Sequence, residues 1–285
     1  MTKKTNPDIY RPLEVPDRLK PYVRRALVAD TAEQVDMVVD VRATGYHYFG
    51  WVWRGRWQGQ VNGEVHSDSD TDGPFHLSGQ VLKSQVFARM QRNVGQIFLE
   101  FSALGHFQLL GITGASMLET AHAPQALNPA LKPHLDRIVC AETTPVKARL
   151  EMIADLLCKL PKHAVPDEVI AAVERIEAVD GDIQLSDLVG ELGLAERQFR
   201  TSFKTLIGLT PKAFCNTLRI NRALNHLLVS NGGDLAGVAA ETGFADQAHF
   251  TRAFSDYLGN APLKYLDEIE ITLARFVGQS RQNLD

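Results

Sequence analysis

The pattern of hydrophobic and polar positions divides the chain near residue 105. From about residue 25 to 102, apolar and polar residues tend to alternate, which is typical of β-strands with one buried face. Asn62-Gly63 lies between two such runs and predicts a two-residue hairpin turn, because both residues tolerate a positive φ. Further turns are expected at Asp72-Gly73-Pro74 and at residues 93–95. The pattern therefore predicts a mostly antiparallel β unit.

After residue 105 the hydrophobic period changes to three or four, which is typical of amphipathic helices. Residues 128–141, 143–161 and 166–181 each predict a helix, and the last helix is expected to stop at Gly181. Helical patterns continue to about residue 266. The expected fold is therefore of the α+β multidomain class. We expect a β domain over residues 1–125, a helical linker over 126–178 and an all-α domain over 179–285.

Composition adds little about function but excludes some classes of protein. The chain is 45% hydrophobic and 22% charged, which suits a globular protein, and its net charge of −4 does not by itself indicate nucleic-acid binding. The first residues lack the apolar core of a secretory signal, and no apolar run is long enough to span a bilayer. A cytoplasmic location without membrane attachment is expected. Cys140, Cys158 and Cys215 form no CxxC pair and are expected to be reduced.

Two segments in the C-terminal part follow the same sequence pattern. Residues 183–214 and 233–265 can be aligned so that a short helix, a glycine, a second helix, a further Gly and a Pro follow in order. Gly193 and Gly243 occupy the expected turns, and each second helix carries two phenylalanines four positions apart, which places them on one face. The duplication predicts two helix-turn-helix units.

The positions between the phenylalanines are expected to face outward and to carry side chains suited to DNA. Arginine, glutamine and threonine reach base edges and phosphates in a major groove that is wide enough for a helix. Residues 211–229 predict one connecting helix about 28 Å long, which could hold the two second helices about one DNA turn apart. Double-stranded DNA is therefore the predicted partner. The candidate DNA-binding residues are Arg197, Gln198, Arg200, Thr201 and Lys204 in the first unit, and Gln247, Ala248, His249 and Arg252 in the second.

This part of the chain resembles the C-terminal domain of the AraC/XylS family of transcription regulators, over about residues 183–265. The resemblance rests on "LRINRALNHLL" and "GFADQAHFTRAFSDYLGNAPLKY", among other motifs, in the order and spacing of the family. It implies that Arg197, Arg200 and Thr201 face bases in one groove, and Gln247, His249 and Arg252 in the next. It also implies a regulator, more often an activator, that forms a homodimer and contacts RNA polymerase.

The sequence departs from the family pattern at the helix starts of the first unit. Ala195 and Gln184 stand where the family usually has helix-capping residues, whereas Asp234 and Asp246 are available as caps in the second unit. The first unit is therefore expected to lack two favourable caps.

Residues 45–60 contain all three tryptophans and are candidates for a binding site in the β domain. Aromatic rings with hydrogen-bonding tips suit a small-molecule pocket, although a plain β core with a dimer surface explains them equally well. The candidate ligand-binding residues are Tyr46, His47, Tyr48, Trp51, Trp53 and Trp57. Residues 75–112 also resemble, more weakly, the cupin-like β-barrel domain of some AraC-type regulators. That second resemblance implies a sensory and dimerising domain without naming a ligand.

Motifs for catalysis or metal binding are not found in the sequence. His47, His66, His76, His106 and His122 stand apart along the chain, without the His-x-His pattern of metal-binding cupins. No enzyme activity, metal or cofactor is expected. The leading hypothesis is a regulator that senses a small molecule. A regulator controlled by a protein partner without a small ligand is the alternative, and a metal-dependent cupin enzyme fused to a DNA-binding module is a distant third.

Overall fold

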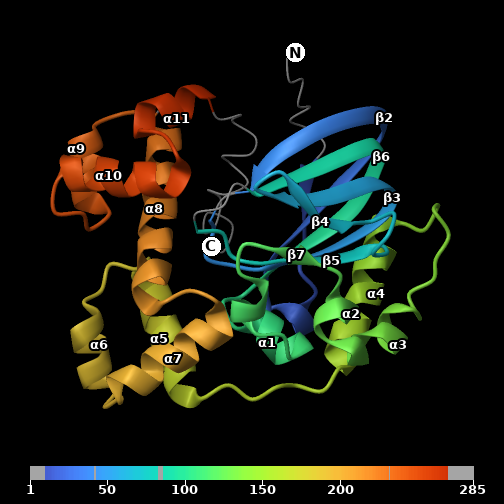
Figure 1. Cartoon of the computed structure of the whole chain (residues 1–285), viewed down its shortest axis with the longest axis horizontal. Helices are drawn as coiled ribbons and strands as arrows, with labels where there is room; N and C mark the ends of the chain where they lie inside the picture. The colour runs from blue at the N-terminus through green and yellow to red at the C-terminus, as the bar shows by residue number, and fades with distance from the viewer. Residues whose placement is uncertain (1–9, 42, 83–85, 231, 269–285) are drawn as a thin grey trace. The chain divides into compact units, whose positions relative to one another are not determined.

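Three long antiparallel strands form the centre of the N-terminal sheet and lie side by side (Figure 1). The structure is a computed structural model that describes residues 10–41, 43–82, 86–230 and 232–268. Within these ranges the sheet order is β1-β2-β6-β3-β5-β7, and β4 pairs with β3. The strands are β1 (Tyr10–Leu13), β2 (Val23–Val41), β3 (Tyr48–Val61), β4 (Glu64–Asp68), β5 (Phe75–Ser78), β6 (Val86–Phe101) and β7 (Ala121–His122). The predicted antiparallel β unit is confirmed.

Of two predicted turns, one is present in the structure and the other is not. Asn62 and Gly63 connect β3 to β4 with φ values of 51° and 88°, as the hairpin prediction requires. The turn predicted at residues 93–95 is wrong, because β6 runs through it: Asn93 pairs with Gln34 and Gly95 pairs with Asp30. Register shifts on the neighbouring strands mark β-bulges there, and bulges use the same residue types as turns. Gly95 is also required by packing, since a Cβ atom at this position would lie 2.4 Å from the indole of Trp53.

Helices between residues 105 and 160 contribute to the same hydrophobic core as one face of the sheet. They are α1 (Gly105–Leu110), α2 (Pro124–Leu127), α3 (Lys132–Leu135) and α4 (Val146–Lys159), with the short 3-10 turns η2 (Asp17–Leu19), η3 (Gly114–Met117) and η4 (Pro129–Leu131). Leu150, Ile153 and Leu157 of α4 are buried together with Phe49 and Ile97 of the sheet. The apolar face predicted for α4 is therefore a core face.

The helix predicted over residues 128–141 is wrong, because only η4 and α3 form there. Pro129 and Pro133 can begin a helical turn, but a proline cannot continue a longer helix, since it lacks the N–H donor. Beyond α3, backbone carbonyl groups accept hydrogen bonds from the side chain of Arg149. Its Nη2 donates to the carbonyl oxygens of Ala141 at 2.7 Å and Glu142 at 3.0 Å.

The C-terminal part is helical, as the change of period predicts. It contains α5 (Asp167–Ala178), α6 (Leu185–Glu191), α7 (Glu196–Ile207), α8 (Pro211–Val229), α9 (Leu235–Glu241), α10 (Gln247–Leu258) and α11 (Pro262–Glu268). The connecting helix α8 has the predicted bounds. It begins where the Thr210 side chain accepts from the Ala213 amide and Pro211 takes the first helical position.

The chain forms two compact units. One unit comprises residues 1–41, 46–166 and 204–208, and the other comprises residues 42–45, 167–203 and 209–285. The division into residues 1–125, 126–178 and 179–285 stays a prediction, although α4, which it assigns to a linker, shares its core with the sheet. In the parts that the structure describes, no helix combines the length and apolar character needed to cross a membrane.

Candidate nucleic-acid interface

The first helix-turn-helix unit is formed by α6, a turn at Gly193 and α7. Gly193 has a φ of 62°, and the turn is held by hydrogen bonds from its amide to the Gly190 carbonyl at 3.1 Å and from the Leu194 amide to the Val189 carbonyl at 3.1 Å. Such a left-handed residue ends a helix most readily when it is glycine. The rings of Phe199 and Phe203 lie 5.5 Å apart and are buried, so the inward face of α7 is as predicted.

The second unit repeats this geometry with α9, a turn at Gly243 and α10. Gly243 has a φ of 73°, and the Phe244 amide donates to the Ala239 carbonyl at 2.9 Å, in the place of the Leu194 bond of the first unit. Phe250 and Phe254 are fully buried, with ring centroids again 5.5 Å apart. The predicted duplication is therefore present as two matching helix-turn-helix units.

Arg219 of α8 supports the turn of the second unit, a role that the sequence did not predict. Its Nε donates to the Thr242 carbonyl at 3.0 Å, a terminal nitrogen also donates to the Gly243 carbonyl, and the guanidinium lies 4.2 Å from the centre of the Phe244 ring. Partial burial lowers the pKa of Arg219 from its ordinary value. No periodic signal distinguishes this arginine from the exposed arginines of the chain.

Helix capping differs between the two units as the sequence predicts. Asp234 accepts from the Ala236 amide at 2.9 Å, and Asp246 accepts from the His249 amide at 2.7 Å. Gln184, at the start of α6, makes no such bond with its side chain. Ala195, which accepts the first backbone bond of α7 from Phe199, has no polar side chain to offer. The second unit therefore has two caps that the first lacks.

All nine candidate DNA-binding residues lie exposed on α7 or α10. Two of them interact within α7: Arg200 Nη2 donates to Glu196 Oε1 at 2.6 Å, and Thr201 Oγ1 donates to the Arg197 carbonyl at 2.9 Å. The Thr201 hydroxyl proton is thus used by the helix, and its oxygen can still accept. That these residues contact DNA stays a prediction.

Comparison with known proteins identifies the helical region. A family model described as a helix-turn-helix domain matches residues 188–268, which include most of both units. The transcriptional regulator ExsA of Pseudomonas aeruginosa is 30% identical over 79 residues, which are 28% of each chain. The virulence regulon transcriptional activator VirF of Yersinia enterocolitica is 32% identical over 80 residues, which are 28% of this chain and 29% of VirF. This region is similar to an AraC-type helix-turn-helix domain.

The chain covers less than a third of the length of these relatives. Among solved structures, ToxT of Vibrio cholerae is 14% identical, with a TM-score of 0.43 over 85% of this chain and 97% of that chain. That likeness concerns the fold alone.

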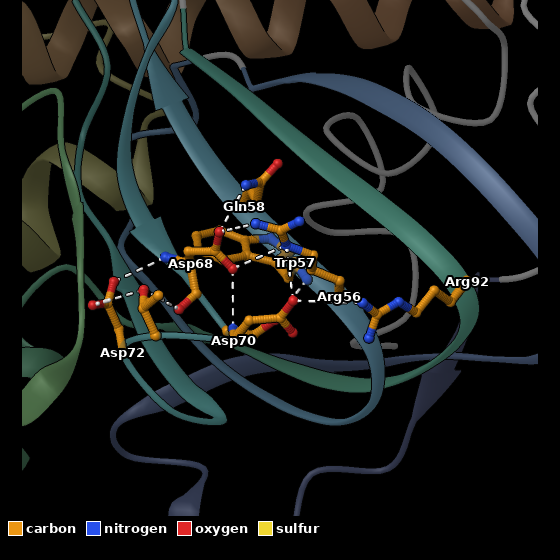
Figure 2. A network of polar contacts seen from close by, with 9 residues as sticks. Arg56, Trp57, Gln58, Asp68, Asp70, Asp72 and Arg92 are labelled. Carbon is orange, nitrogen blue, oxygen red and sulfur yellow. Dashed lines mark hydrogen bonds and ion pairs between the residues drawn. The ribbon is translucent and has the colours of Figure 1, made fainter.

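Outside the helix-turn-helix region, acidic residues at the end of β4 and in the loop that follows form a dense polar network with arginines. Figure 2 shows Asp68 beside Arg56 and Gln58, with Asp70 between Arg56 and Arg92. Asp68 accepts from Gln58 Nε2 at 2.7 Å and forms an ion pair with Arg56, whose Nε also lies 3.2 Å from Asp70 Oδ2. The Arg56 guanidinium lowers the pKa of Asp68 to about 2. The network ties the loop to β3.

This network was not among the features predicted from the sequence, although aspartates occupy every second position at Asp68, Asp70 and Asp72. Alternating carboxylates of this kind also occur in calcium-binding loops. Here Asp68 and Asp70 are paired with arginines, and Asp72 accepts from the Asp68 amide at 2.8 Å. Across the described residues, no group of three or more His, Cys, Asp or Glu side chains is arranged to hold a metal ion.

The aromatic residues of β3 do not form one cluster. Trp51 and Trp53 pack with the core of the sheet and α4, and the Arg149 guanidinium lies 5.2 Å and 4.5 Å from their rings. Trp57 belongs to a second cluster, because the register shifts around Gly55 reverse the alternation of faces along β3. Tyr46 and His47 precede β3, and Tyr48 donates to Glu100 at 2.5 Å.

Trp57 is part of a group that we name the inner polar cluster: Tyr10, Trp57, His76, Met90 and Gln96. The rings of Trp57 and His76 stack 3.7 Å apart, and the sulfur of Met90 accepts from Tyr10 at 3.1 Å and from Gln96 at 2.5 Å. Burial lowers the pKa of His76 to about 3, so it is neutral near pH 7. Among the described residues, Trp57 Nε1, His76 Nε2 and Gln96 Oε1 have no hydrogen-bond partner.

Two of the histidines that stand apart in the sequence are neighbours in the structure. The rings of His47 and His106 are fully buried with centroids 3.8 Å apart, which corrects the expectation that each is isolated. Burial, and then the nearby His106, hold the pKa of His47 well below its ordinary value. Neutral imidazoles stack at such a distance, whereas two charged rings would repel each other.

Proposed function

We propose that this chain is a sequence-specific DNA-binding transcription regulator that acts as an activator. The observation that carries the proposal is the pair of matching helix-turn-helix units, each with a buried phenylalanine pair and an exposed face of hydrogen-bonding side chains. ExsA and VirF, which are similar to part of this chain, are named a transcriptional regulator and a transcriptional activator. In the proposed complex, α7 and α10 occupy successive major grooves.

Charge determines how such a regulator would bind DNA. Residues 182–264 contain eight basic and eight acidic residues, so the domain has no net charge that would attract DNA over its whole surface. Affinity must then come from specific contacts that side chains of α7 and α10 make with DNA. Backbone amides at helix starts would hold phosphates, and two protomers would bind one site. Each phosphate contact makes the affinity more sensitive to salt.

The proposal is tested by genome-wide capture of DNA bound to the tagged full-length chain. The double variant Arg200→Ala with Arg252→Ala is compared with Lys20→Ala with Arg175→Ala, which removes the same charge from exposed positions outside α7 and α10. We expect discrete peaks for the wild-type chain and the control, and loss of these peaks for the double variant. Identical peaks in all three samples would contradict DNA reading by α7 and α10.

We further propose that the β unit senses a small molecule at the inner polar cluster. Buried polar atoms are nearly always hydrogen-bonded in folded proteins, and each unpaired one costs about 1–3 kcal/mol. An uncharged ligand with hydrogen-bonding groups would pair with Trp57 Nε1, His76 Nε2 and Gln96 Oε1. Within the predicted set of aromatic residues, this favours Trp57 over Trp51 and Trp53, whose rings contact Arg149.

A ligand at this cluster would act by shifting an existing equilibrium in dimer geometry or in the freedom of the DNA-binding units. Homodimerisation, contact with RNA polymerase and a cytoplasmic location are parts of the same proposal. Trp57→Phe removes the indole N–H and keeps an aromatic ring. We expect this variant to fold and to lose the response of operator binding to extracts of small metabolites from the host.

Control by a protein partner without a small ligand is the alternative. It would be supported if dialysed wild-type chain and Trp57→Phe responded equally to a host protein fraction and neither responded to the metabolite extract. A matched control is Trp53→Phe, which changes a tryptophan of the same strand outside the inner polar cluster.

A further inference from the structure

An ion pair on α7 distinguishes the first recognition helix from the second. Glu196 is the first residue of α7, and its Oε1 accepts from Arg200 Nη2 one turn later at 2.6 Å. Both side chains are exposed, at 61% and 63% of their surface. At the matching place in α10, three residues before the phenylalanine pair, stands the uncharged Gln247. Among the described residues, Arg252 of α10 has no ion-pair partner.

The position of this carboxylate is unfavourable for general DNA affinity. A negative charge on the face that enters the groove is repelled by the phosphates on both sides. As a stabilising contact, an exposed pair at positions i and i+4 contributes little to the stability of the fold. Another exposed ion pair, Arg175 with Glu191 at 2.5 Å, joins α5 to α6 outside the recognition helices. The small stabilising effect of an exposed ion pair does not by itself explain a carboxylate on this face of α7.

The two side chains offer complementary chemistry to base edges. An ionised carboxylate only accepts hydrogen bonds and suits the N4 amino group of cytosine, whereas the donors of arginine suit O6 and N7 of guanine. Arg200 uses one of its five N–H groups on Glu196, so the others remain for a base. Within the described residues, Glu196 Oε2 accepts no hydrogen bond.

The spacing on the helix suits two neighbouring bases. Residues at i and i+4 are about 6 Å apart along a helix axis, and the N-terminal residues of a recognition helix are those that reach base edges. Successive base pairs are about 3.4 Å apart, so the distance between the two residues along the helix corresponds to one or two base-pair steps. The ion pair also restrains Arg200 before DNA arrives, which reduces the entropy lost on binding.

We propose that Glu196 is a specificity-determining residue of the first unit. Its carboxylate accepts from N4 of a cytosine next to a guanine that Arg200 contacts, and its charge weakens binding to all other sequences. This inference rests on the proposed function, because it requires α7 to enter a major groove. It adds an acidic residue to the set of base-reading side chains and predicts a cytosine beside the guanine in the first half-site.

The test measures binding of the full-length chain to its operator and to every single-base substitution of that operator. Glu196→Gln gives α7 the residue that α10 has at the matching place. We expect the preference for cytosine at one position to fall about fivefold or more, while binding to unrelated DNA becomes tighter. Glu191→Gln removes a carboxylate from the comparable ion pair outside α7, and it should leave all base preferences unchanged.

A second variant separates base reading from helix stabilisation. Glu196→Asp keeps a negative charge in the first turn of α7, where it favours the helix dipole, but its shorter side chain does not reach the base. The inference predicts that Glu196→Asp loses the cytosine preference as Glu196→Gln does. Base preferences that stay at wild-type levels in both variants, or that Glu196→Asp restores, would overturn the inference alone. A wild-type chain without any sequence preference would instead overturn the proposed function.

Discussion

The two helix-turn-helix units share a structural skeleton, formed by the turn glycine and the buried phenylalanine pair. They differ at the starts and on the exposed faces of their helices. Both have a glycine at the turn with a positive φ, and both have a phenylalanine pair with ring centroids 5.5 Å apart. The second unit has aspartate caps on both of its helices, and the first has neither. The skeleton is constrained by packing in both units, whereas the starts and outer faces of the helices are free to diverge.

The outer faces diverge in the order of two residues. The first unit has Arg200 followed by Thr201, and the second has Thr251 followed by Arg252 after the matching phenylalanine. One position along a helix is a rotation of about 100°, so the two guanidinium groups leave their helices along different lines. The units therefore cannot read the same base sequence in the same way. We expect the two half-sites of the operator to differ.

The largest expected effect is the loss of stability when a buried phenylalanine is removed. It tests whether the skeleton packs equally well in both units. Phe203→Ala and Phe254→Ala each remove a fully buried ring, and each should lower the free energy of unfolding by about 3–5 kcal/mol. Urea denaturation followed by circular dichroism measures both values. A much smaller cost for Phe203→Ala would show that the first unit packs less tightly than the second, and the equivalence would fail.

The next effect concerns the outer face of the second unit. If Arg252 contacts a base, Arg252→Ala should cost about 1–3 kcal/mol of binding free energy and relax the preference at one base position. Binding titrations against the operator and its single-base variants measure both quantities. Uniform weakening across all sequences, with a shallower dependence on salt, would make Arg252 a phosphate contact instead. The same substitution at Arg200 gives the corresponding value for the first unit.

Features that depend on residues close together in the sequence were predictable. The Asn62-Gly63 turn, the bounds of α8, the caps at Asp234 and Asp246 and the exposed faces of α7 and α10 each depend on residues within one turn or one helix. Local preferences and tertiary packing agree at these positions, so a single sequence is sufficient to predict them.

Features that depend on a distant partner were not predictable. The bulge at residues 93–95 uses the same residue types as a turn, and only its pairing with β2 distinguishes the two. The separation of Trp57 from Trp51 follows from register shifts around Gly55, which period-two alternation does not include. Arg149 and Arg219 bind carbonyl groups of other segments, and nothing in their own sequence neighbourhood indicates this. The DNA and ligand contacts themselves stay predictions.

A smaller effect is expected from the caps of the second unit. Asp246→Ala removes the acceptor of the His249 amide bond and should lower the free energy of unfolding by about 0.5–2 kcal/mol. Gln184→Ala in the first unit is the matched control, because the Gln184 side chain makes no capping bond. Chemical denaturation of both variants measures the difference. Equal costs for the two substitutions would mean that capping does not distinguish the units.

The smallest effect is a gain of stability in the first unit. Ala195 accepts the first backbone bond of α7, so a serine there can cap the Gln198 amide, while the Gln198 side chain can bond back to the amide of residue 195. Ala195→Ser should raise the free energy of unfolding by about 0.5–1 kcal/mol. Ala245→Ser, one residue before the Asp246 cap in the second unit, should give no such gain. If Ala195→Ser also gives none, the weaker start of α7 does not arise from its missing cap, and the contrast between the units lies in their outer faces alone.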